Sequence, residues 1–150
     1  MPNFCYHDVD CVFYKIYIND TSIAILTDCG KYDDYIINCL KDVNYLMLES
    51  NYDYHRLMTN QYPDFLKKRI NSDKGHLSNV DCAEIIIKIL NDKLKTICLS
   101  HISEHSNDNQ FALMAVYDYL INKNINKKEI PNIITAKKNE STVIIDEGVV

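Results

Sequence analysis

Hydrophobic and polar positions along the chain fall into two patterns that predict strands. Near the start, two β-rich segments, the first with alternating apolar and polar side chains, are joined by the polar turn Asn19-Asp20, which predicts a β-hairpin. Further along, short and mostly apolar runs bounded by polar residues are typical of strands covered on both faces. The predicted strands cover residues 11–18, 22–27, 45–48, 96–100, 130–136 and 142–146.

Between these strands, apolar side chains recur every three or four residues, which is the spacing of amphipathic helices. The predicted helices cover residues 32–41, 109–122 and the stretch from Ser78 to about Lys93, with one or two more within 52–72 that break near Pro63. Ser78 followed by Asp81 is typical of a capped helix start. The alternation of strands and helices predicts a single α/β domain over residues 1–150, with helices mainly on one face of one sheet.

Length and charge narrow the functional classes. A chain of 150 residues with 47% hydrophobic and 25% charged residues can bury a substantial core as one domain. The net charge of −5 provides no global basic field for nucleic acid, so a phosphate-bearing substrate would need a local site or a bound metal. No apolar run approaches the roughly 20 residues of a membrane span, and no signal pattern is present. We expect a cytoplasmic protein without a membrane partner.

The six cysteines have neither metal-binding nor redox spacing such as Cys-x-x-Cys. Most of them lie inside apolar runs. We therefore expect reduced thiols that pack as small hydrophobic side chains.

Polar groups stand where the predicted strands end, and the ends of strands are where α/β sheets place functional groups. Asp28, Glu49 and His101 each follow a predicted strand, and His76 precedes the helix that starts at Ser78. Carboxylate and imidazole together suit a divalent transition metal such as Zn²⁺ or Mn²⁺.

Each of these residues also has a structural interpretation that the sequence leaves open. Asp28 is equally suited to a turn or a helix cap, His76 to a hydrogen bond near Ser78, and His101 to burial with its ring satisfied by backbone groups.

Four segments, taken in order, resemble successive motifs of metallo-β-lactamase-fold hydrolases. They are Ile25–Gly30, Leu46–Asp53, Lys74–Asn79, and Leu99–Glu104 with Asn107. The resemblance is closest to the small exonuclease-like branch and more distant to ribonuclease Z, which shares a Gly-His-Ser/Thr segment and a Thr-His corner. His7-Asp8-Val9 resembles the His-Asp segment of the exonuclease-like branch. The likeness covers nearly the whole chain and implies the C-terminal half of such a fold, a truncated metallo-β-lactamase-like sandwich.

The resemblance also implies roles for individual residues. It makes Asp28 the catalytic carboxylate that bridges two metals, and His101 a ligand of the second metal. It makes His76 the catalytic histidine that contacts the scissile phosphate or protonates the leaving oxygen. Residues implied to line or support the substrate site are Asn51, Asp53 and Ser103.

The chain departs from this family at its start. The family's His-x-His-x-Asp-His loop and a further histidine ligand precede these motifs, whereas only His7 precedes Asp28 here. The metal site is therefore expected to be incomplete. The missing half should also leave an apolar sheet face or edge uncovered, so we expect a second copy of the chain or a protein partner to cover it.

Two functions from different classes follow. The sequence favours a non-catalytic or partner-dependent protein that acts through protein binding or self-association, of the kind borrowed by phages and mobile elements. The alternative is a metal-dependent phosphodiesterase or nuclease completed by a separately encoded N-terminal half. For the substrate, the sequence leaves four alternatives open: DNA, RNA, a cyclic nucleotide, or none.

Overall fold

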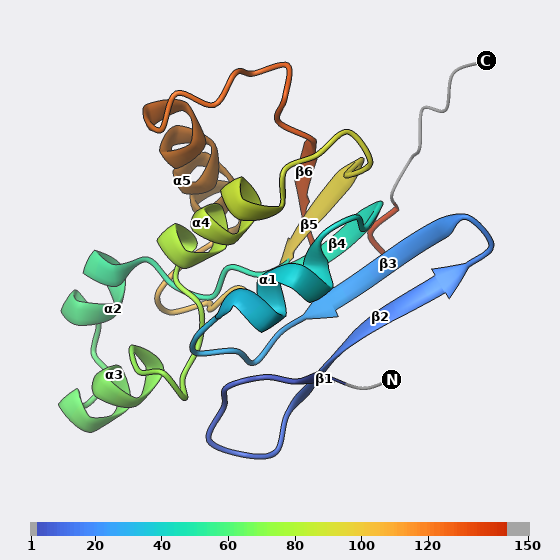
Figure 1. Ribbon diagram of the computed structural model, residues 1–150. Helices are drawn as coiled ribbons and strands as arrows, with labels where there is room; N and C mark the ends of the chain where they lie inside the picture. The colour runs from blue at the N-terminus through green and yellow to red at the C-terminus, as the bar shows by residue number, and fades with distance from the viewer. Residues whose placement is uncertain (1–2, 144–150) are drawn as a thin grey trace.

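The computed structural model describes residues 3–143, which form one six-stranded sheet with helices packed on one face (Figure 1). The strands are β1 (Asn3–Phe4), β2 (Val12–Ile18), β3 (Thr21–Leu26), β4 (Tyr45–Glu49), β5 (Thr96–Ser100) and β6 (Asn132–Thr135). The helices are α1 (Asp34–Leu40), α2 (Tyr54–Thr59), α3 (Asp64–Ile70), α4 (Asn79–Ile89) and α5 (Asn109–Asn122). This arrangement confirms the predicted fold class.

The strands follow one another across the sheet in chain order. β1, β2 and β3 pair antiparallel, whereas β3, β4, β5 and β6 pair parallel. The carboxyl ends of β3, β4 and β5 therefore meet at one edge of the sheet, and α2 and α3 lie beyond that edge (Figure 1). None of the helices in residues 3–143 is long and apolar enough to cross a membrane.

Most predicted elements are found with boundaries shifted by a few residues. The capping box is present: the Ser78 hydroxyl accepts from the Asp81 backbone N–H while the Asp81 carboxylate accepts from the Ser78 N–H. Helix α4 ends at Ile89, earlier than predicted, because the Asn91 side chain donates to the Ile89 carbonyl and accepts from the Lys93 N–H, which favours a turn.

Two differences concern the ends of the chain. The short strand β1 was not predicted, because two residues carry no periodic pattern. Of the strand predicted over residues 142–146, Thr142 and Val143 are not in a strand, and the other positions lie outside the described residues.

The core lies between the sheet and helices α1, α4 and α5. Alternate positions of β3 and β4 point into it, so that Ala24, Leu26, Leu46 and Leu48 are at most 1% exposed. They share one hydrophobic cluster with the apolar face of α4. Burying each large aliphatic side chain in this way stabilises a fold by roughly 1.5–3 kcal/mol.

The opposite face of the sheet is apolar and carries no described helix (Figure 1). We name it the open sheet face. Strand pairing aligns Tyr14, Ile25, Met47, Cys98 and Ile134 in one row across β2 to β6. A parallel row begins with Ile16 and Ile23, and the β2 members of the two rows, Tyr14 and Ile16, are 48% and 43% exposed. Cys98 in the first row is only 3% exposed and all of β5 is buried, so the exposed apolar surface lies mainly on β2. Exposed apolar surface of this kind marks an interaction site.

Two glycines bring the loop after β3 against the loop before α4. A Cβ atom on Gly30 would lie 2.4 Å from the Gly75 nitrogen, and one on Gly75 would lie 2.0 Å from the Ile70 carbonyl oxygen. Backbone therefore packs directly on backbone here. This close approach places Asp28 and His76, which flank the two glycines, at the same edge of the sheet.

Replacing Gly30 with alanine should push these loops apart. We expect Gly30→Ala to lower the free energy of unfolding by about 1–3 kcal/mol, because the added methyl group has no space. Lys31→Ala is the control, since its exposed ion pair with Asp73 contributes little. Urea unfolding measures both, and a Gly30→Ala protein as stable as the wild type would contradict the packing described.

Candidate metal site

Asp28 and His101 leave their strands with the same unusual backbone conformation. Their φ angles are 55° and 52°, in the left-handed region that residues other than glycine seldom adopt. The chain therefore turns sharply just beyond β3 and just beyond β5. The two side chains converge at the carboxyl edge of the sheet, where His101 Nε2 lies 3.7 Å from Asp28 Oδ1.

Glu49, the last residue of β4, lies beneath these two residues and is fully buried. One of its oxygens, Oε1, is 2.7 Å from His76 Nδ1 and 2.6 Å from His101 Nδ1. The other, Oε2, accepts a hydrogen bond of 2.9 Å from the Cys29 N–H. One carboxylate thus ties together the ends of β3 and β5 and the loop before α4.

The ionisation of Glu49 decides which histidine nitrogens face the site. Burial raises the pKa of Glu49, but hydrogen bonds from His101 and His76 outweigh it, so the pKa lies below its usual value. An ionised carboxylate only accepts hydrogen bonds, so both Nδ1 atoms must carry a proton. In the neutral rings, Nε2 is then the free lone pair on His76 and on His101.

His7 joins the site from the segment between β1 and β2. A backbone hydrogen bond of 2.7 Å from the Gly30 N–H to the Tyr6 carbonyl holds this segment beside the end of β3. The His7 ring lies 5.1 Å from the His76 ring, and His7, Asp28 and His76 each offer a ligand atom within 4.8 Å of the others. Sequence reasoning set His7 aside, although the resemblance of His7-Asp8-Val9 to a His-Asp segment was a usable signal.

The donor atoms fit a divalent transition metal. Carboxylate oxygen and imidazole nitrogen both bind Zn²⁺ and Mn²⁺, and two ligand atoms of one such ion lie roughly 3–3.5 Å apart. The spacing of Asp28 and His101 is close to this value. His7 approaches Asp28 from the side of His76. Its Nδ1 is 2.9 Å from the Gly75 carbonyl and its Nε2 is 3.1 Å from Asp8, so His7 can bind a metal through Nε2 only by leaving Asp8. Glu49, His76 and His101 also form a cluster of potential ligands. Since the Glu49 oxygens are already engaged, Glu49 would orient the histidines rather than bind a metal itself, as outer carboxylates do in metal sites.

The chain resembles known proteins in sequence and in fold. The chain is 35% identical to exodeoxyribonuclease YycJ of Bacillus anthracis over 118 residues, which is 78% of this chain and 45% of YycJ. It is 36% identical to exodeoxyribonuclease WalJ of Streptococcus pneumoniae over 108 residues, or 72% of this chain and 40% of WalJ. The metallo-β-lactamase-fold protein YhfI of Bacillus subtilis superposes with a TM-score of 0.62 at 15% identity, covering 91% of this chain and 45% of YhfI.

The chain is similar in sequence to these exodeoxyribonucleases and has a metallo-β-lactamase-like fold. A fold of the same kind is seen in the short form of human tRNase Z, with a TM-score of 0.50 and 15% identity over 69% of this chain and 35% of that one. No family model matches the chain. The chain spans less than half the length of the nuclease relatives that it matches.

The three residues predicted to line the substrate site make different contacts in the structure. The buried Asn51 donates a hydrogen bond of 2.7 Å to the His101 carbonyl and accepts one of 2.9 Å from the Ser103 N–H, so it holds the loop after β5. Asp53 caps α2 by accepting from the Arg56 N–H. Ser103 lies in the same loop as His101. The substrate-binding roles of all three stay predictions.

A buried amide network supports the loops behind the site. The Asn107 side chain donates to the Ser50 carbonyl at 3.0 Å and to Asn79 Oδ1 at 2.8 Å, and the Ser50 hydroxyl donates to the same Asn79 oxygen at 2.7 Å. These bonds join the loop after β4 to the start of α4 and the loop before α5. Fully satisfied buried networks of this kind make a site rigid.

Cysteine chemistry does not contribute to this site. Cys29 follows Asp28, and its thiol donates to the Lys31 carbonyl. Burial raises the pKa of Cys29 to about 11, so the thiol is protonated at neutral pH and is not a nucleophile. All six cysteines are free.

The hydrogen bond from His101 to Glu49 should be visible as a pH dependence in metal-free protein. This bond and the nearby charges raise the pKa of His101 above its usual value, although burial opposes them. The stability that the charged His101 ring contributes is therefore fully present below about pH 6.5 and is lost as the pH rises through the raised pKa. Because the pKa of Glu49 is lowered, the stability that its carboxylate contributes is fully present above about pH 4.5 and is lost at more acidic pH.

We therefore expect Glu49→Gln to lower the pKa of His101, and the stability lost in the variant to be greatest between about pH 4.5 and 6.5. NMR titration of the histidine rings in EDTA measures the pKa, and urea unfolding measures the stability. Glu84→Gln is the matched control, because Glu84 also accepts two side-chain hydrogen bonds, from Tyr32 and Tyr119, away from the site. An unchanged pKa of His101 in Glu49→Gln would refute the assigned contact.

Proposed function

We propose that this chain contributes to the active site of a metal-dependent phosphodiesterase that hydrolyses DNA. The observation that supports this most strongly is the convergence of Asp28 and His101, together with the buried Glu49 that turns Nε2 of His101 and His76 outward. The nuclease relatives supply the substrate class, since both are exodeoxyribonucleases by name.

In this proposal each side chain has a separate task. Asp28 and His101 would hold the metal together with His7, and the metal would supply Lewis-acid stabilisation of the charge on a phosphodiester. His76 has its Nδ1 proton fixed by Glu49 and keeps 18% of its side chain exposed. Once its Nε2 is also protonated, His76 can donate that proton to a phosphate or leaving oxygen.

We further propose that a protein partner completes the donor set by packing on the open sheet face. Three protein ligands are the minimum of catalytic zinc sites, and a second metal needs more than Asp28, His101 and His7 can offer. Asp28 and His101 follow β3 and β5 of this sheet, and the exposed apolar side chains of the open sheet face lie on the neighbouring strand β2. A partner with an apolar sheet and with imidazole or carboxylate groups at its edge would meet both needs.

Metal binding tests the proposed site directly. We expect the chain to bind Mn²⁺ or Zn²⁺ by calorimetry, and Asp28→Asn and His101→Ala to reduce the affinity at least about tenfold by removing a ligand. His105→Ala is the matched control, because His105 packs against the Tyr62 ring outside the site. If His101→Ala and His105→Ala bind metal equally well, His101 is not a ligand and the proposed function fails.

Protein binding without catalysis is the second candidate function, and the open sheet face favours it. If a second copy covers this face, the chain should be a dimer by light scattering at micromolar concentration. Ile16→Glu should then dissociate the dimer, because it buries a charge in an apolar interface. Phe65→Glu is the control, since Phe65 is an exposed apolar residue on α3 away from that face. A stable monomer would contradict self-association.

A further inference from the structure

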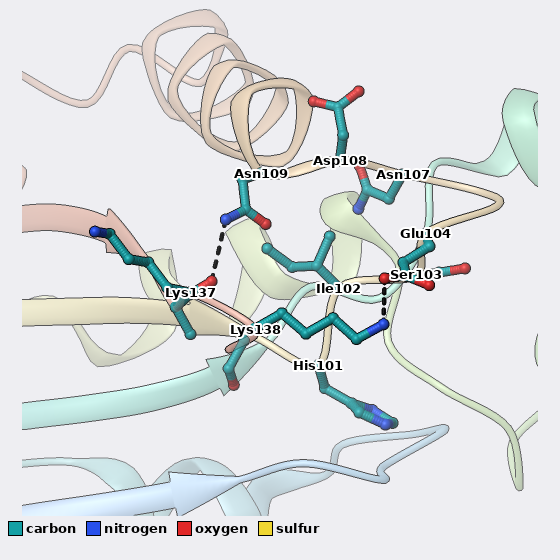
Figure 2. Close-up of a pocket in the computed structure, with 11 residues that line it drawn as sticks. His101, Ile102, Ser103, Glu104, Asn107, Asp108, Asn109, Lys137 and Lys138 are labelled. Atoms are coloured by element: carbon teal, nitrogen blue, oxygen red, sulfur yellow. Dashed lines mark hydrogen bonds and ion pairs between the residues drawn. The ribbon is translucent and has the colours of Figure 1, made fainter. Parts of the chain in front are cut away.

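A cavity of about 760 Å³ lies beside the metal site, between the loop from β5 to α5 and the segment that follows β6. We name it the β5–β6 cavity. Figure 2 shows Ile102 in its centre, Ser103, Asn107 and Asn109 around it, and His101 below. Cavities that bind small molecules have volumes of roughly 300–1,000 Å³, so this one is large enough for a nucleotide.

The two consecutive lysines after β6 point in different directions at this cavity. The Lys138 side chain crosses the cavity between Ile102 and His101 and forms an ion pair with Glu104 on the opposite wall (Figure 2). The Lys137 side chain points away (Figure 2) and pairs with Glu140 at 2.7 Å. Only Lys138 therefore presents its ammonium group to a ligand in the cavity.

The Lys138–Glu104 ion pair is suited to exchange. Both side chains are more than 60% exposed, and ion pairs with such exposure stabilise a fold very little. A phosphate group offers the ammonium more acceptor oxygens than the carboxylate and carries a comparable or greater negative charge. Lys138 can leave Glu104 for a phosphate without disturbing any buried contact.

His101 links this cavity to the metal site. It lines the cavity, and its Nε2 lies 3.7 Å from Asp28 on the other side. A DNA strand whose phosphodiester lies at Asp28 and His101 would have its adjoining nucleotide within reach of Ile102 and Lys138. Apolar carbon atoms of Ile102 and Ala136 would face the sugar and base, and Ser103 and Asn109 offer hydrogen-bonding groups.

We propose that the β5–β6 cavity holds the deoxynucleotide adjoining the scissile phosphodiester, with Lys138 exchanging Glu104 for a phosphate of the strand. This inference rests on the proposed function, because it takes DNA as the substrate. In this inference Lys138 binds the substrate, and Glu104 pairs with the Lys138 ammonium group when no substrate is bound.

The test is a titration of the whole chain, in EDTA and at low salt, with thymidine 5′-monophosphate, followed by NMR of the backbone amides. We expect saturable shifts at residues 101–109 and 136–138. Lys138→Ala should weaken binding about tenfold through loss of a charge-assisted hydrogen bond. Glu104→Gln should tighten binding about twofold or threefold, because the ion pair that it removes is weak.

Matched variants separate a contact from a general effect of charge. Lys137→Ala and Glu140→Gln remove the same charges from the neighbouring ion pair, which points away from the cavity. We expect neither to change the affinity more than about twofold, as is usual for exposed pairs. Equal weakening by Lys137→Ala and Lys138→Ala would overturn the proposal, as would the absence of shifts in the two segments. Inorganic phosphate that binds the same residues as tightly as the nucleotide would also overturn it.

Failure of this inference is distinguishable from failure of the proposed function. Nucleotide binding is measured without metal, and metal binding is measured without nucleotide. If metal binds at Asp28 and His101 but Lys138→Ala binds nucleotide like the wild type, the cavity assignment falls and the metal site stands. If nucleotide binds as expected but no metal does, the cavity is a binding site and the hydrolytic proposal falls.

Discussion

The arrangement of the site depends on one buried carboxylate. A charge taken out of water is strongly unfavourable unless hydrogen bonds and opposite charges compensate for it. Glu49 meets this requirement with two imidazole rings and a backbone N–H, which come from three separate segments of the chain. Because all three must be in place at once, the carboxylate couples the folding of β3, β5 and the loop before α4 to the orientation of His76 and His101.

The positive φ angles and the paired glycines serve the same geometry. Asp28 and His101 adopt a left-handed conformation that costs about 1 kcal/mol or more each, and such strain persists only where surrounding contacts enforce it. The close packing of Gly30 on Gly75 and the bonds of Asn51 and Ser103 provide those contacts. Tertiary contacts thus compensate for the backbone strain of Asp28 and His101 at the edge of the sheet that carries the potential metal ligands.

Sequence reasoning found most of the elements and the strand-end residues, but not how they interact. Alternation and apolar runs predicted β2 to β6, and the Ser78–Asp81 pair predicted the start of α4, because these signals are local. Glu49 was recognised only as a polar residue at a strand end, since its burial depends on residues 27 and 52 positions away. His7 was missed because its approach to Asp28 depends on the β1–β2 segment folding back along β3.

Glu49 fixes both histidines with Nδ1 protonated and Nε2 facing the candidate metal site. The most direct measurement is a long-range ¹H–¹⁵N NMR spectrum of the metal-free chain with ¹⁵N-labelled histidine, recorded at a pH at which the rings are neutral. We expect His76 and His101 both to carry their proton on Nδ1, and Mn²⁺ or Zn²⁺ then to perturb the Nε2 signal of His101. Protonated Nε2 atoms on these two neutral rings would contradict it.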